Sequence, residues 1–108
     1  MKIAISSTGN SLDSPIDPRF GRCCYFVIYD TEDKTIDFIP NPNKNAEEKA
    51  GSASVQLMAS KAISKIISGE FGLKIKSNLD SLKIQMIILK EPETKIKDII
   101  EILNKTNY

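Results

Sequence analysis

The chain has 108 residues, a length typical of one domain, and its 41% hydrophobic and 27% charged residues are the usual balance of a globular protein. Its 15 Lys and Arg nearly cancel its 14 Asp and Glu, and the lysines are spread along the chain, so we expect no nucleic-acid partner. No apolar run reaches the roughly 20 residues of a membrane-spanning helix, and the N-terminus is too short and strand-like for a signal peptide. We expect one domain over residues 1–108, no membrane partner and a cytoplasmic location.

Short apolar runs alternate with helical patterns along the chain, and turn residues separate them. The expected elements, in chain order, are strands at 2–6, 25–30 and 35–39, a helix at 50–61, a strand at 63–68, a short helix marked by Ile75, Leu79 and Leu82, a strand at 85–89, and a helix marked by Ile96, Ile99, Ile100 and Leu103. Residues 11–22 contain two prolines and a glycine and are expected to form a loop. The first helix is expected to bury Ala50, Ala53, Leu57 and Met58.

The order of a strand, a hairpin and then alternating helices and strands predicts a mostly parallel sheet with helices on its faces. The simplest arrangement places the hairpin on one side of the first strand and the last two strands on the other. Successive strands are then added first on one side of the first strand and afterwards on its other side. Ligands of open α/β sheets bind where the strand order reverses in this way, at the carboxyl ends of the strands. Residues 6–10 and 68–72 form those ends, and the long loop to Cys24 starts there.

Cys23 and Cys24 are the only cysteines, and the chain has no histidine. Adjacent cysteines form a strained disulfide at best and cytosolic thiols are mostly reduced, so we treat both as thiols. Since neighbouring side chains alternate at the entrance of a strand, we expect Cys23 to face the loop and Cys24 the core. The lack of histidine removes the commonest general base and the commonest metal ligand.

Segments along most of the chain resemble one known family. They are Met1-Lys2-Ile3-Ala4-Ile5, Leu12-Asp13-Ser14-Pro15, Asp17-Pro18-Arg19-Phe20-Gly21-Arg22-Cys23 with Tyr25-Phe26 entering a strand, Asn41-Pro42, Ala50-Gly51 followed by Gln56-Leu57, and Ile67-Ser68-Gly69 with Phe71-Gly72. Together they resemble the dinitrogenase iron–molybdenum cofactor biosynthesis family, the group of small NifX/NifY-type proteins and the C-terminal domain of NifB. The Phe-Gly-Arg segment is the most specific part of the match.

The resemblance implies a ribonuclease H-like three-layer α/β fold, with a five-stranded mixed sheet in the order 3-2-1-4-5, strand 2 antiparallel and helices on both faces. It also implies a role in holding iron–sulfur or iron–molybdenum cofactor precursors, with cofactor-assembly proteins as further partners. The sequence departs from the family in two places. Arg19 stands where some members have a histidine just before Phe-Gly, and the segment after Gly72 is rich in lysine and lacks the family's usual proline.

Cys23 is the candidate metal ligand, because thiolates bind iron in clusters and nearby cations lower the pKa of a thiol. Arg19 and Arg22 are the only arginines, lie within four positions of Cys23 and are suited to neutralise an anionic cluster. Each of these assignments has a structural alternative. Either cysteine is equally suited to pack against the sheet, and the arginines to pair with Asp13 or Asp17 and fasten the loop.

Ser7, just after the first strand, and Gly69, in a strand-to-helix turn whose N–H groups can face an anion, complete the candidate cofactor-binding residues. Two thiols cannot complete the usual four-cysteine cluster site. A bound cluster must therefore be preassembled and held by few protein ligands, or be shared between subunits. That is the behaviour of a transient carrier.

The leading interpretation is a non-catalytic carrier for an iron–sulfur or iron–molybdenum cluster. A nuclease is disfavoured because two-metal chemistry needs clustered carboxylates, and the expected parallel strands contain no acid. A serine hydrolase would lack its histidine base. The rival interpretation is a regulatory or adaptor domain that binds a small anion or a protein partner through the same loop. No exposed apolar stripe calls for an oligomer, so we expect a monomer.

Overall fold

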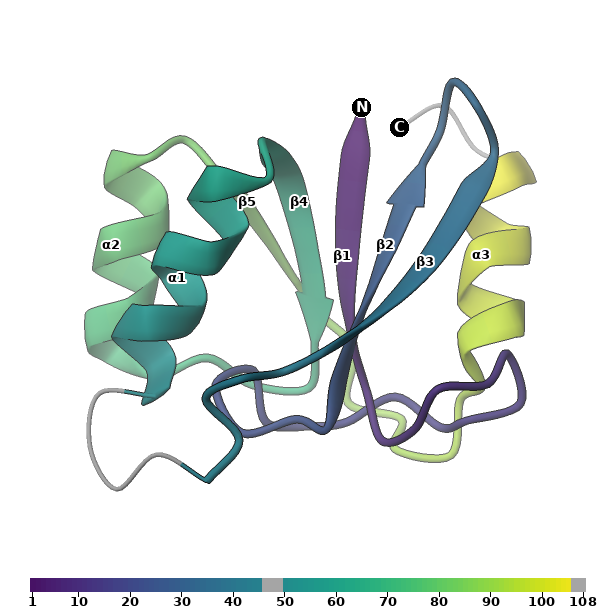
Figure 1. Cartoon of the computed structure of the whole chain (residues 1–108), viewed down its shortest axis with the longest axis horizontal. Coiled ribbons are helices and arrows are strands. Elements are labelled where there is room, and N and C mark those ends of the chain that lie inside the picture. The colour runs from purple at the N-terminus through teal and green to yellow at the C-terminus, as the bar shows by residue number, and fades with distance from the viewer. Residues whose placement is uncertain (46–49, 106–108) are drawn as a thin grey trace.

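Five strands form one mixed sheet in the order β3-β2-β1-β4-β5 in the computed structural model, which describes residues 1–45 and 50–105 (Figure 1). The strands are β1 (Lys2–Ser7), β2 (Tyr25–Asp30), β3 (Thr35–Pro40), β4 (Ile63–Ser68) and β5 (Gln85–Ile88). β2 runs antiparallel to β1 and β3, whereas β1 pairs in parallel with β4, and β4 with β5. The predicted strand order and the antiparallel second strand are confirmed.

Three helices cover the two faces of this sheet. Helices α1 (Ala50–Ser60) and α2 (Leu73–Ser81) lie together on one face, and α3 (Ile96–Lys105) lies on the other (Figure 1). The α3 residues Ile96, Ile99, Ile100 and Leu103 are buried, as their helical spacing predicts. The fold is therefore the three-layer, ribonuclease H-like arrangement that the family resemblance implies. None of the helices within residues 1–45 and 50–105 is long and apolar enough to cross a membrane.

The buried side of α1 differs in part from the predicted one. Ala50 and Met58 are buried as expected, but Ala53 is only partly buried and Leu57 packs at the margin of the core. The buried residues of this helix are Ala50, Ser54, Val55 and Met58. Because alanine, glycine and serine fill the first turns, the hydrophobic periodicity is too weak to define how the helix is rotated against the sheet.

Alternating side chains of the strands build a hydrophobic core on each face of the sheet. In β1, for example, Ala4 packs into the core beneath α1 and α2, and Ile3 packs into the core beneath α3. The loop after β1 joins both cores. Ile16 belongs to the α3 side, and Phe20 and Cys23 belong to the opposite side. Both faces of the sheet therefore hold this loop in place.

Candidate functional site

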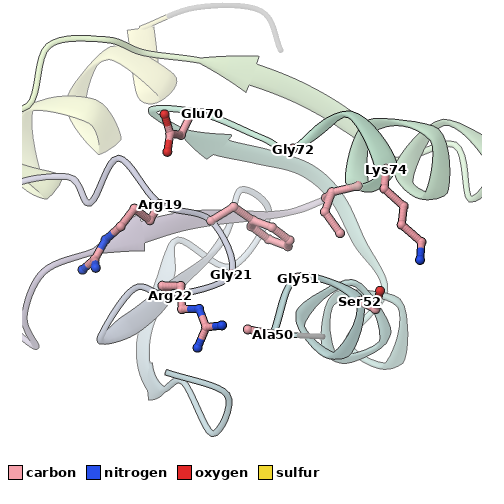
Figure 2. Close-up of a pocket in the computed structure, with 11 residues that line it drawn as sticks. Arg19, Gly21, Arg22, Ala50, Gly51, Ser52, Glu70, Gly72 and Lys74 are labelled. Atoms are coloured by element: carbon pink, nitrogen blue, oxygen red, sulfur yellow. The ribbon is translucent and has the colours of Figure 1, made fainter. Parts of the chain in front are cut away.

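A cleft of about 570 Å³ lies between the loop that precedes β2 and the first turns of α1 and α2 (Figure 2). Its lining residues are 19–22 of the loop, 50–52 of α1, and Glu70, Gly72, Lys74 and Ile75 from the segment that follows β4. The carboxyl end of β4 and the loop before Cys24 were both predicted to border the binding crevice. The wall formed by α1 was not predicted.

Positive charge dominates this cleft. Arg19, Arg22 and Lys74 line it, and Glu70 is the single acidic residue among its described lining. The first turns of α1 and α2 contain no acidic side chain, and the N-cap of α2, Gly72, offers no side-chain hydrogen bond. The N–H groups at a helix N-terminus carry partial positive charge. Those of α1 and α2 border the cleft, and no acidic side chain in the first turn of either helix neutralises that charge.

Two glycines bring the walls of the cleft into direct contact. A Cβ added to Gly21 would lie 2.9 Å from the Gly51 nitrogen and 3.0 Å from the Gly51 Cα, so the loop backbone rests on the first turn of α1. A Cβ added to Gly51 would lie 2.7 Å from Ile75 Cδ1 of α2. The loop, α1 and α2 thus touch at these two glycines, and at Gly21 the neighbouring atoms belong to the backbone.

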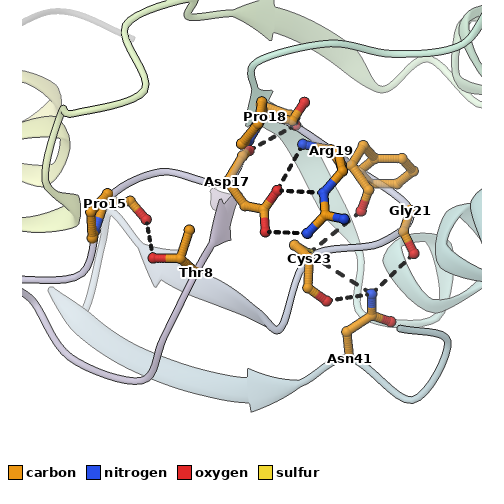
Figure 3. Close-up of polar contacts among 10 residues, drawn as sticks. Thr8, Pro15, Asp17, Pro18, Arg19, Gly21, Cys23 and Asn41 are labelled. Carbon is orange, nitrogen blue, oxygen red and sulfur yellow. Dashed lines mark hydrogen bonds and ion pairs between the residues drawn. The ribbon is translucent and has the colours of Figure 1, made fainter. Parts of the chain in front are cut away.

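Arg19 is fastened to the loop by Asp17 (Figure 3). The Asp17 carboxylate, 2% exposed, accepts hydrogen bonds from the Arg19 backbone N–H at 2.9 Å, from Nε at 3.3 Å and from Nη2 at 3.4 Å. The hydrogen bond and charge of Asp17 raise the pKa of the Arg19 guanidinium. Asp13 instead pairs with Lys97 at 3.0 Å. The loop-fastening alternative is therefore confirmed for Arg19 with Asp17. Arg22 is half-buried and lies beside Ala50 in Figure 2.

The predicted orientation of the two cysteines is wrong. Cys23 is fully buried, its thiol donates to the Phe20 carbonyl at 3.5 Å, and Cys24 is the half-buried member of the pair. Burial raises the pKa of the Cys23 thiol to about 12. The chain bends at Cys24 and β2 begins only at Tyr25, so strand alternation does not extend through the two cysteines.

Ser7 and Gly69 do not line the cleft. Ser7 is buried, and its hydroxyl donates to the Gly9 carbonyl at 2.7 Å in a local turn. A Cβ added to Gly69 would lie 2.5 Å from the Pro18 Cα, so this glycine allows β4 and the loop to approach closely. Of the five predicted cofactor-binding residues, the structure brings only Arg19 and Arg22 together at the cleft, and the metal-binding role of Cys23 stays a prediction.

Lys74, Ser52 and the first turn of α1 were not among the predicted site residues. The Ala50-Gly51 pair was noted as a family landmark, but nothing in its sequence indicates that it borders the Arg19–Arg22 segment. Within residues 1–45 and 50–105, no group of three or more His, Cys, Asp or Glu side chains is arranged to hold a metal ion. The donors at the cleft are cations and N–H groups, which fit an anion rather than a bare metal cation.

The fold and the cleft together define a small α/β protein of ribonuclease H-like topology with a cationic site beside the carboxyl end of a parallel strand. The chain belongs to the dinitrogenase iron-molybdenum cofactor family, whose sequence model matches residues 1–106. Membership confirms the resemblance drawn from the loop and the later landmarks. It suggests involvement in the biosynthesis or binding of the iron–molybdenum cofactor.

Solved structures share this fold. The apo form of the orange protein from Desulfovibrio gigas matches with a TM-score of 0.86 and 23% identity, over 96% of this chain and 87% of that chain. A Thermotoga protein provisionally described as a NifB protein matches with a TM-score of 0.79 and 26% identity, over 96% of this chain and 87% of that chain. No curated protein matches the sequence.

Proposed function

We propose that this chain is a non-catalytic carrier that holds a preassembled iron–sulfur or iron–molybdenum cluster in the cleft. The observation that carries this assignment is that Arg22, Lys74 and the first turns of α1 and α2 all line one opening of about 570 Å³. Membership of the iron-molybdenum cofactor family supports the choice of cargo. In this role Arg22, Lys74 and the first-turn N–H groups of α1 and α2 bind the cargo.

An anionic metal–sulfur cluster suits the donors of this cleft. Guanidinium, ammonium and backbone N–H groups all bind anions, and hydrogen bonds to cluster sulfurs tune and stabilise such groups. Glu70 is the only acidic residue of the described lining, which leaves few ligands for a bare metal ion. The cargo therefore arrives assembled, is held mainly by charge and hydrogen bonds, and is released to a cofactor-assembly protein.

Cys23 remains the proposed thiolate ligand, but metal binding by Cys23 requires the segment around it to move. Its sulfur lies in the core and the Phe20 carbonyl accepts its hydrogen bond. Cys24, the neighbouring thiol, is half-buried. We infer that the cationic cleft captures the cargo first and that a thiol contact follows.

A regulatory or adaptor domain that binds a small anion is the second candidate function. The observation that favours it is the donor set itself, because guanidinium and helix N-termini bind oxyanions as readily as cluster sulfides. In both functions the chain acts as a cytoplasmic monomer without nucleic acid or membrane as a partner. The two functions differ in whether the bound group contains iron and sulfide.

Uptake of a preformed, thiolate-capped [4Fe–4S] cluster tests the carrier function. Wild type is mixed with the cluster under anaerobic conditions, desalted and examined by absorption spectroscopy. We expect wild type to retain cluster absorption and the double variant Arg22→Gln/Lys74→Gln to bind about tenfold more weakly or worse, because it loses two charge-assisted contacts. Added salt is expected to weaken binding to wild type.

The matched control is Lys2→Gln/Lys34→Gln, which removes the same charge at positions that do not line the cleft. Equal loss in the control and the cleft variant would indicate nonspecific attraction and would contradict the assignment of the site. If wild type takes up no cluster but binds inorganic phosphate in a manner that depends on Arg22, the adaptor function replaces the carrier function.

A further inference from the structure

Asn41 is a buried polar residue that lies outside the cleft and contacts the loop that forms one wall of it. It follows β3 and is 6% exposed. Its Nδ2 group donates to the Gly21 carbonyl at 3.1 Å and to the Cys23 carbonyl at 2.9 Å (Figure 3). Its Oδ1 accepts the Asn43 N–H at 3.0 Å, and its own backbone N–H donates to the Cys24 carbonyl at 3.0 Å.

The two carbonyls held by this single amide group flank Arg22. The Gly21 carbonyl belongs to the peptide that joins Gly21 to Arg22, and the Cys23 carbonyl belongs to the peptide that joins Cys23 to Cys24, so one Nδ2 atom holds the backbone just before Arg22 and just after Cys23. Gly21 is also pressed against the first turn of α1, which leaves the backbone little freedom to rotate. The direction in which Arg22 leaves the loop is therefore fixed from a residue 19 positions away in the sequence.

We propose that Asn41 is the positioning residue that aims Arg22 at the cleft. Among uncharged side chains, only an amide supplies two donors from one nitrogen, and glutamine is one methylene longer than asparagine. Removal of these donors leaves the Gly21 and Cys23 carbonyls without this partner and releases the peptide before Arg22 and the peptide after Cys23. Asn41 acts through Arg22, because it does not itself line the cleft.

The arginine side-chain NMR spectrum tests this role directly, because the chain has only two arginines and hence two Nε–H signals. We expect Asn41→Asp, which is nearly isosteric but lacks both donors, to shift and broaden the Arg22 signal. The Arg19 signal should stay in place, because Asp17 holds that side chain. Asn41→Ser removes the donors without adding charge and serves if the first variant fails to fold.

The control is Asn10→Asp, which introduces the same charge at an exposed position. An unchanged Arg22 signal in a folded Asn41 variant would overturn the positioning role. Equal changes in both arginine signals would also overturn it, because they would indicate general loosening of the loop.

Because the effect of Asn41 on cargo binding rests on the proposed function, a double-mutant cycle with the preformed cluster separates the two ideas. We expect Asn41→Ser to weaken binding about tenfold in wild type and to have little further effect in Arg22→Gln. The same loss in both backgrounds would overturn the positioning role. If Arg22→Gln binds the cluster like wild type, the proposed function of Arg22 fails, and the NMR result alone decides the role of Asn41.

Discussion

Burial raises the pKa of the Cys23 thiol to about 12, so at neutral pH this cysteine is a protonated core side chain. Arg19 also has a structural role, because the buried Asp17 carboxylate accepts three hydrogen bonds from it. The residues of the candidate site thus have different roles. Cys23 and Asp17 stabilise the loop, Asn41 orients it, and Arg22 contributes a cation to the cleft.

The raised pKa of Cys23 predicts a pH dependence of stability. An unfolded cysteine loses its proton near its ordinary pKa of 9.0, whereas the folded one keeps it to about pH 12. The contribution of this group is complete below pH 9 and is lost as pH rises toward 12, because the unfolded state binds fewer protons in that window. The free energy of unfolding of wild type should fall by up to about 1.4 kcal/mol per pH unit more steeply than that of Cys23→Ser.

Urea unfolding of both proteins, followed by circular dichroism from about pH 8 to about pH 11, measures this difference. The lysines and tyrosines titrate in both proteins, so the difference between the two slopes isolates Cys23. Parallel curves would mean that the thiol is not buried as described.

At the scale of elements, strands were predicted more accurately than the loop that carries the site. Apolar runs bounded by turn residues located β1, β4 and β5 to within a residue, because burial on a sheet leaves a clear local pattern. The orientation of Cys23 depends on a single bend at Cys24, and the role of Asn41 depends on hydrogen bonds to residues far away in sequence. Neither feature has a local sequence signal.

Gly69 was predicted to bind the ligand, but in the structure it packs against Pro18 of the loop that precedes β2. Its added Cβ would lie 2.5 Å from the Cα and 2.8 Å from the Cβ of Pro18, and a backbone atom cannot turn aside as a flexible side chain can. We expect Gly69→Ser to lower the free energy of unfolding by about 1–3 kcal/mol. Chemical denaturation measures the effect.

Gly72→Ser is the matched control from the same connection between β4 and α2. The nearest atom to its added Cβ is Ile75 Cγ1 at 3.9 Å, and serine is a favourable N-cap for α2. This variant should be as stable as wild type or more stable. Similar losses for the two variants would contradict the assignment of Gly69 to close packing.

At the scale of the whole molecule, the two faces of the sheet have different roles. Helix α3 and the core beneath it support one face, while α1, α2 and the loop that precedes β2 form the cleft on the other (Figures 1 and 2). The reversal in strand order beside β1 predicted where a ligand should bind, because helix N-termini and strand ends converge there. The part played by α1 was not predictable, since it depends on the contact between Gly21 and Gly51.

NMR of the ¹⁵N-labelled protein with the preformed [4Fe–4S] cluster shows whether a metal–sulfur cluster binds in this cleft. Thermally populated paramagnetic states of the cluster broaden the amide signals closest to it. We expect the signals of Gly21, Gly51, Ser52 and Gly72 to be lost first and those of α3 to remain sharp. Broadening centred on α3 or elsewhere away from the cleft, or no broadening at all, would contradict cluster binding in the cleft.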